Sequence, residues 1–292
     1  MNQKELRTKG LLIASMLIFG TIGIFRRYIP LSSSYLALLR GTIGMLFLLI
    51  ITHVSGKRVN RYAVRSNLLL LLISGGILGF NWILLFEAYQ YTTVATATLC
   101  YYMAPVIVLL LSPVLLKERL SMKQVLCILA ALIGLALVSG ITDINSIGAG
   151  EWKGILFGLG AAVFYAGVIL LNKKLNKISA YDRTIFQLGA SSLILLPYTA
   201  FTGGFFCAEA SLSIALVVLI VGVVHTGVAY ALYFGSMNNL KAQTIALYSY
   251  IDPAAAVLLS AFVLKEGMSA AEMAGAVLVL GATLLSELPD KR

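Results

Sequence analysis

The sequence contains few charged residues, and this shortage limits what class of protein it can be. Only 12% of the 292 residues are Asp, Glu, Lys or Arg, whereas 60% are hydrophobic. An ordinary soluble domain is about a quarter charged. The apolar residues fall in blocks of roughly 20, which is the length a helix needs to cross about 30 Å of hydrocarbon. The composition excludes a soluble domain and indicates a polytopic α-helical membrane protein.

Motifs for catalysis, cofactors and metals are also missing. The chain has two histidines, no H-E-x-x-H pair and no P-loop, so neither metalloprotease chemistry nor direct use of ATP is expected. Its three cysteines, Cys100, Cys127 and Cys207, fit neither a disulfide framework nor a metal-binding spacing. No small-residue cleavage site follows the apolar stretch 10–25, which we interpret as a first span rather than a signal peptide. We therefore expect no enzyme, cofactor or metal.

Apolar segments separated by short polar connections predict ten transmembrane helices. Short connections make consecutive helices antiparallel neighbours, so the predicted fold class is an all-α integral membrane protein. The predicted spans are about 9–27, 34–53, 67–89, 95–116, 122–140, 152–171, 181–201, 212–236, 243–264 and 269–288.

The net charge of +10 is distributed unevenly between the two sides of the membrane. If the N-terminus is cytoplasmic, most Lys and Arg residues fall on that side, whereas the other side holds only Arg26, Arg27, Lys153 and Lys265. This is the positive-inside pattern of a cell-membrane protein, and it places both termini in the cytoplasm. The basic residues then face anionic lipid head groups, so no nucleic-acid partner is implied.

The chain resembles itself at a shift of 148 residues. Residues 96–121 (TATLCYYMAPVIVLLLSPVLLKERLS) align without a gap on residues 244–269 (TIALYSYIDPAAAVLLSAFVLKEGMS), with 11 of 26 positions identical. Apolar composition alone would supply shared leucines. It would not supply Tyr-x-x-Pro and Lys-Glu in register, so we interpret the match as an internal repeat.

A repeat of five spans has a consequence for topology. Five is odd, so the second copy enters the membrane from the opposite side, and the chain is predicted to form two inverted five-helix repeats. The first repeat covers 1–140, a linker covers 141–151, and the second repeat covers 152–292. Two inverted halves around one site have two near-equivalent arrangements, each open to one side, which is typical of secondary transporters.

Both halves resemble the EamA family of the drug/metabolite transporter (DMT) superfamily. The resemblance lies in FEAYQYTTVATATLCYYMAPVIVLLLSPVLLKERLSMKQVLCILAALIGLALVSG in the first half and ALYFGSMNNLKAQTIALYSYIDPAAAVLLSAFVLKEGMSAAEMAGAVLVLGATLL in the second. It implies a ten-helix transporter with a central cavity. Transporters of this kind move amino acids or other small organic metabolites, often outward.

Two prolines lie near mid-membrane in the fourth and ninth predicted spans. Pro105 and Pro253 lack an N–H, so the carbonyls of Tyr101 and Ser249 lose their usual helical partners. Freed carbonyls at this depth must face protein or a wet cavity. Paired breaks of this kind point to a binding site, although prolines that only kink helices for packing would look the same.

Two ionisable residues lie at mid-depth in the second half, where they are costly and normally face the interior. Asp252 replaces Ala104 of the first half, and His225 replaces Ile77, so the repeat itself requires neither. We expect Asp252 and His225 to line the cavity, where one of them binds a substrate amine or carries a proton. A buried structural pair is the alternative.

Other embedded polar and aromatic residues are candidates for the cavity or its gate. Glu87 and Arg40 both lie toward the outer side, where an ion pair would gate the mouth, unless each only snorkels to the interface. Asn81 and Trp82 lie deeper in the third span. Trp82 and four tyrosines would form aromatic walls, or would be ordinary packing residues: Tyr101, Tyr102, Tyr248 and Tyr250.

The predicted function is a secondary transporter of small organic solutes, with protons as a further partner; the sequence does not indicate an oligomeric state. A phosphorylated substrate would need several deep basic residues, but only Arg40 lies away from the helix ends. A zwitterionic, neutral or cationic solute fits better, and amino-acid or metabolite efflux is the specific expectation. The alternatives are an intramembrane enzyme and a non-transporting sensor or structural membrane protein.

Overall fold

The structure is a computed structural model that describes residues 3–26, 28–92, 94–138, 151–175, 177–205, 211–263 and 269–287. Several features singled out in the sequence lie outside these ranges. They are residues 141–150 of the predicted linker, Arg27, Cys207, Lys265 and Glu266.

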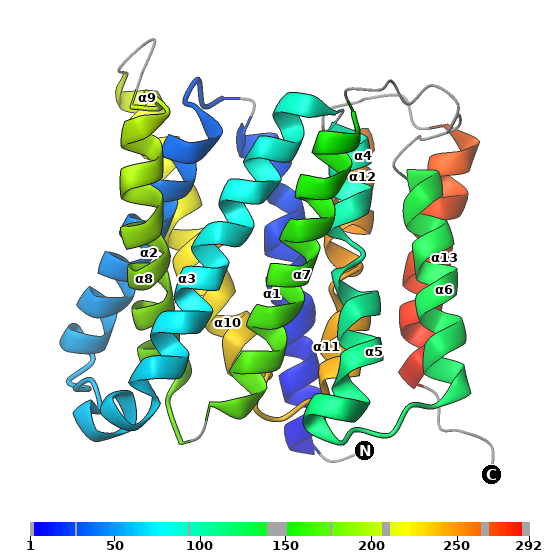
Figure 1. Ribbon diagram of the computed structural model, residues 1–292, viewed down its shortest axis with the longest axis horizontal. Helices are drawn as coiled ribbons and strands as arrows, with labels where there is room; N and C mark the ends of the chain where they lie inside the picture. Colours follow the sequence, from blue (N-terminus) through cyan, green and yellow to red (C-terminus); the bar gives the residue numbers. More distant parts are fainter. Residues whose placement is uncertain are drawn as a thin grey trace.

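The described residues form a bundle of helices that run between two ends (Figure 1). We call these the upper and lower ends, as drawn in Figure 1; α1 begins at the lower end. Seven elements are continuous helices: α1 Gln3–Arg26, α2 Ser33–Val54, α3 Arg61–Tyr91, α6 Met122–Val138, α7 Trp152–Lys174, α8 Ala180–Phe201 and α13 Ala270–Glu287.

The remaining elements are segments of interrupted helices. α4 (Val94–Tyr101) is followed by α5 (Ala104–Leu116), and α11 (Ala242–Tyr248) by α12 (Ile251–Val263). A third run passes from α9 (Leu212–Ile220) through a π-helical segment, η2 (Val221–Val228), into α10 (Ala229–Ser236).

Among the described residues, six stretches are long and apolar enough to cross a membrane, which agrees with a multi-pass membrane protein. They are Glu5–Arg26, Ser33–Val54, Arg61–Tyr91, Trp152–Lys174, Ala180–Phe201 and Leu212–Ser236. Shorter apolar helices account for the fourth, fifth and tenth predicted spans: Ala104–Leu116, Met122–Leu137 and Met273–Leu285. Large apolar side chains such as Leu69, Val114 and Leu193 remain exposed on the outside of the bundle, at 72%, 77% and 70%, as lipid contact requires.

Short polar side chains set where several helices begin. The hydroxyl of Ser32 accepts a hydrogen bond from the backbone N–H of Tyr35, and Ser179 and Ser211 cap α8 and α9 in the same way. Asn60 caps α3, which begins earlier than its apolar run. Each cap satisfies a backbone donor that the first helical turn leaves without a partner.

Two of these three interruptions occur at the expected prolines. Pro105 lies in the first turn of α5 and Pro253 in the first turn of α12. At the first break the N–H of Met103 donates to the carbonyl of Cys100 at 3.1 Å, and at the second Tyr250 donates to Leu247 at 3.2 Å. At each of these two breaks the backbone therefore makes a tight turn, since the proline cannot donate a hydrogen bond, and then resumes as a helix.

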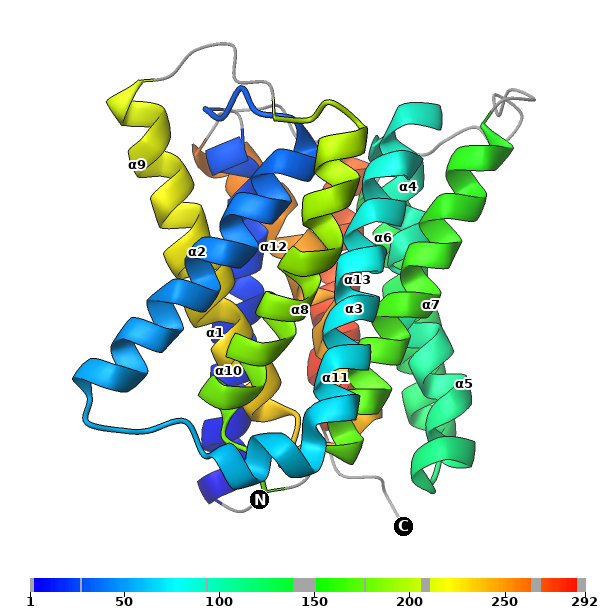
Figure 2. The ribbon, with the colours of Figure 1, turned by 60° about the vertical axis from the view of Figure 1, so that its left-hand side comes forward.

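The packing of the helices places both breaks near the middle of the bundle. α1 packs along α12, while α4 and α5 pack along α7. α3 lies against α7 and α8 (Figure 2), and α6 pairs with α13 at one edge (Figure 1). The largest core cluster joins buried residues of several of these elements and of α10, including Leu78, Val168, Tyr233 and Ile251.

Candidate functional site

A cavity of about 570 Å³ lies between α1, α2, α3, α4, α7, η2, α10 and α12. Arg26 at the end of α1 and Ser33 at the start of α2 line its upper part. Tyr101 and Asp252, at the two helix breaks, line it at mid-depth. The cavity thus runs from the breaks toward the upper end, and its volume is in the range of sites for small organic ligands.

Asp252 supplies an acidic group to this cavity. It occupies the first turn of α12, where the N-terminal end of a helix favours negative charge. Its Oδ2 accepts a hydrogen bond of 2.8 Å from the hydroxyl of Tyr102. Asp252 is only half-buried, so the carboxylate has both a fixed partner and access to the cavity.

Arg40 supplies a basic group to the same cavity. Its guanidinium carbon lies 4.7 Å from the ring centroid of Trp82, a cation–π arrangement. Its Nε is buried and has no hydrogen-bond partner among the described residues. This position differs from the expected outer gate, because Arg40 lines the cavity itself.

Aromatic side chains form much of the remaining wall. The hydroxyl of Tyr165 donates to that of Tyr233 at 2.7 Å, and the two rings are stacked with centroids 6.4 Å apart. Tyr101 lies against Tyr165, and Trp82 packs edge-on against Tyr230. The wall therefore offers π-faces to a solute between the acidic and basic groups.

Tyr165, Tyr230 and Tyr233 are lining residues that the sequence reasoning missed. Tyrosine at these positions is not shared with the other repeat copy, so the repeat gave no signal for them. Their position on α7 and α10 depends on which helix face turns inward, and these nearly uniformly apolar helices do not encode that face by periodicity.

His225 does not line the cavity with Asp252. It lies in η2, is 2% exposed, and its Nε2 shares a hydrogen bond of 2.7 Å with Thr21 of α1. The ring also packs edge-on against Phe25 at 4.7 Å. The imidazole thus links η2 to α1 beside the cavity.

Three other candidate residues also lie outside the cavity wall. Tyr250 is fully buried and donates to the carbonyl of Tyr102 at 3.0 Å. Asn81 is fully buried and donates to the carbonyl of Ala161 at 2.6 Å, which fastens α3 to α7. Tyr248 is part of the central hydrophobic cluster.

The expected ion pair between Glu87 and Arg40 is not formed. Glu87 accepts a hydrogen bond from the hydroxyl of Tyr198 on α8, while Arg40 stacks on Trp82. Within the described ranges, the one ion pair closer than 4.0 Å joins Lys9 to Glu5 at the start of α1.

Below the cavity, hydrogen bonds close the lower end of the bundle. Both carboxylate oxygens of Glu118 accept from the backbone N–H of Ala242, at 3.0 and 3.1 Å, which caps α11. Lys173 of α7 donates to the carbonyls of Met237 and Leu240, and the fully buried Arg183 donates to the carbonyl of Phe234. We call this set, centred on Glu118, Lys173 and Arg183, the lower lock.

Comparisons with known proteins identify the family. The EamA-like transporter family matches residues 8–140 and 152–288. The chain belongs to this family. Among its EamA relatives, the "uncharacterized transporter YxxF" of Bacillus subtilis (strain 168) is 35% identical over 85% of this chain and 79% of its own length.

Two further comparisons agree with the membership of the EamA family. An "uncharacterized transporter" of Archaeoglobus fulgidus is 30% identical and covers 94% of both chains. One solved crystal structure aligns with a TM-score of 0.84 over 96% of this chain and 97% of its own, at 18% identity, and so supports the fold alone. The protein is thus a membrane transporter of the EamA type.

Proposed function

We propose that this EamA protein is a secondary transporter that moves zwitterionic amino acids or closely related solutes across the cytoplasmic membrane. The main support for this proposal is that Asp252 and Arg40, which have opposite charges, line the same aromatic-walled cavity. A carboxylate on the solute would be bound by the guanidinium of Arg40, which lines the cavity. An ammonium group would be bound by Asp252 and the tyrosine faces.

The cavity composition argues for solutes with an apolar or aromatic side chain. Phe19, Trp82, Tyr101 and Tyr230 contribute rings to the wall, so an apolar side chain would be desolvated there. A phosphorylated solute would need more than one basic group deep in the cavity. Arg40 is accompanied only by Arg26, whose Nη2 is already bonded to the carbonyl of Leu31 at 3.0 Å.

We further propose that the bundle consists of two inverted five-helix repeats, residues 1–140 and 152–292, that exchange between two states. Support comes from the packing. When each span is replaced by its repeat mate, the α3–α7 contact corresponds to α10–α1, the α3–α8 contact to η2–α2, and the α5–α7 contact to α12–α1. Equivalent contacts in the two halves are what an architecture of repeats predicts.

The state described is open toward the upper end, where the cavity lies, and closed below by the lower lock. We assign the lower end to the cytoplasm because most Lys and Arg residues lie there, which also makes both termini cytoplasmic. An exported solute would then leave by the upper end. Asp252 is the group we assign to any proton coupling, because it contacts the cavity whereas His225 does not.

Trp82 provides a direct test of solute binding. The chain has two tryptophans, and the other, Trp152, is 60% exposed, so Trp152→Phe leaves only the cavity fluorophore. We expect a saturable change in Trp82 emission with apolar zwitterionic amino acids, together with flux of the same solutes in liposomes. Binding without flux would favour a sensor, and neither binding nor flux across an amino-acid panel would contradict the proposed substrate class.

A further inference from the structure

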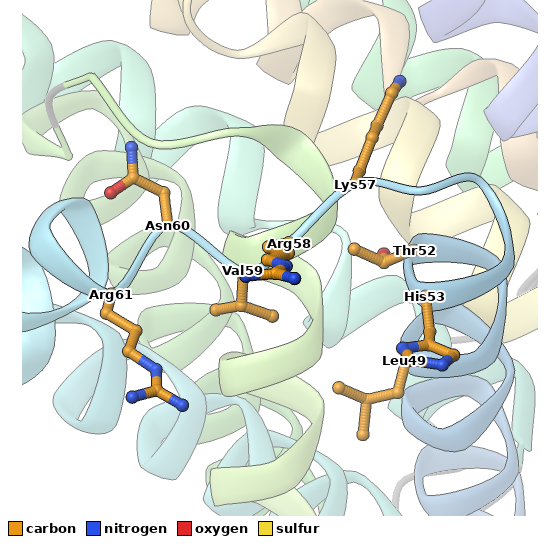
Figure 3. A pocket seen from close by; sticks show the side chains of 8 residues that line it. All are labelled: Leu49, Thr52, His53, Lys57, Arg58, Val59, Asn60 and Arg61. Carbon is orange, nitrogen blue, oxygen red and sulfur yellow. The ribbon is translucent and has the colours of Figure 1, made fainter.

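A second cavity lies at the lower end, away from the solute site. It has a volume of about 920 Å³ and lies between the end of α2, the connection that follows it, and the start of α3. Figure 3 shows Leu49, Thr52 and His53 on α2, Arg58 and Val59 on the connection, and Arg61 on α3. We call it the α2–α3 pocket.

The α2–α3 pocket is strongly basic. His53, Lys57, Arg58 and Arg61 all line it, and no acidic residue does. Arg58 and Arg61 are exposed and hold charged groups at the level where helices end. Basic groups at this depth attract the phosphates of anionic lipids.

The apolar side of the pocket favours a lipid over a free anion. Leu49 and Val59 line it beside the basic groups. Leu46 lies one turn along the same face of α2 and is 47% exposed, and neighbouring Ile50 is 60% exposed. An amphiphile could place its phosphate between Arg58 and Arg61 while an acyl chain follows this exposed stripe.

We propose that the α2–α3 pocket binds the head-group phosphate of an anionic phospholipid. The site is separate from the solute cavity and does not depend on the identity of the solute. It would hold the lower end of α2 at a defined depth in the membrane interface.

The test is native mass spectrometry of the full-length protein with equimolar phosphatidylglycerol and phosphatidylcholine. We expect wild type to retain phosphatidylglycerol preferentially, and the Lys57→Gln/Arg58→Gln/Arg61→Gln variant to lose roughly tenfold or more of that preference. The matched control, Arg119→Gln/Lys174→Gln/Lys177→Gln, removes the same charge from exposed positions at the same end and should behave as wild type. All six side chains are exposed, so we expect both variants to fold.

Two outcomes decide the nature of the ligand. Equal loss in the pocket and control variants would overturn the proposal in favour of bulk charge. Displacement of phosphatidylglycerol by inorganic phosphate at equal concentration would overturn the lipid assignment in favour of a free-anion site.

Discussion

The hydroxyl of Tyr102 donates a 2.8 Å hydrogen bond to Oδ2 of Asp252, although 150 residues separate them in the chain. Tyr250, the repeat mate of Tyr102, donates to the Tyr102 carbonyl at 3.0 Å instead. The two equivalent tyrosines therefore have different roles. One orients a cavity carboxylate and the other holds the turn that carries the first tyrosine, so the site is asymmetric within a repeated frame.

Replacing Arg40 with Gln should change selectivity more than folding. The guanidinium is the proposed partner of the solute carboxylate, and a lost charge-assisted hydrogen bond costs about 1.5–3 kcal/mol. We expect wild type to prefer an amino acid over its methyl ester by roughly tenfold or more, and Arg40→Gln to bind both equally. Competition assays on Trp82 fluorescence in the Trp152→Phe background measure this ratio. An unchanged preference in Arg40→Gln would remove Arg40 from the site.

Gly20→Ala should damage the contact between α1 and α12 next to the site. A Cβ at Gly20 would lie 2.9 Å from the carbonyl oxygen of Asp252 and 2.9 Å from Cβ of Ala255. Overpacking of this kind costs about 1–3 kcal/mol, so both thermal stability and flux should fall. Gly10→Ala on the same helix is the control, since nothing lies within 4 Å of its Cβ and it should stabilise slightly. Equal thermal midpoints for the two variants would contradict the proposed close contact.

Glu118→Gln should loosen the lower lock. The carboxylate caps α11 from another part of the chain, and loss of such a charged cap costs about 1–2 kcal/mol. We expect a population shift toward a state open at the lower end. A cysteine placed at the fully buried Ser236, in a background without Cys100, Cys127 and Cys207, reports this opening by its rate of thiol labelling. Faster labelling is expected in Glu118→Gln, and an unchanged rate would argue against the lock.

His225→Gln should leave the pH dependence of flux in place. His225 bonds to Thr21 and lies outside the cavity wall, so the substitution replaces one neutral hydrogen bond worth about 0.5–1.5 kcal/mol. We expect flux within roughly threefold of wild type at each pH, with the same profile shape. A flat profile in liposomes with a pH gradient would assign the proton to His225 rather than to Asp252.

The sequence predicts how deep a residue lies along a membrane-spanning helix better than it predicts which way its side chain faces. Pro105 and Pro253 predicted helix breaks because proline cannot donate a backbone hydrogen bond, and they lie in the first turns of α5 and α12. Arg40 and Glu87 stand within apolar stretches of the sequence, but their partners, Trp82 and Tyr198, depend on how α2, α3 and α8 pack. Helices that are apolar on nearly every side carry little information about which face turns inward.

The missed features share a second cause. The π-helical turn of η2 and the bond between Thr21 and His225, 204 residues apart, arise from long-range packing that no local pattern encodes. The lower lock likewise uses Lys173 and Arg183, which in the sequence resemble ordinary basic residues at helix ends.

The most direct test of the central claim is flux of a radiolabelled apolar amino acid into liposomes that contain purified wild-type protein or Asp252→Asn. Asn keeps the size of the side chain and can still bond to Tyr102, so the variant should fold with the wild-type thermal midpoint. The account predicts that Asp252→Asn loses roughly tenfold or more of the flux and its dependence on a pH gradient. Wild-type flux with wild-type pH dependence in Asp252→Asn would contradict the placement of the solute between Asp252 and Arg40.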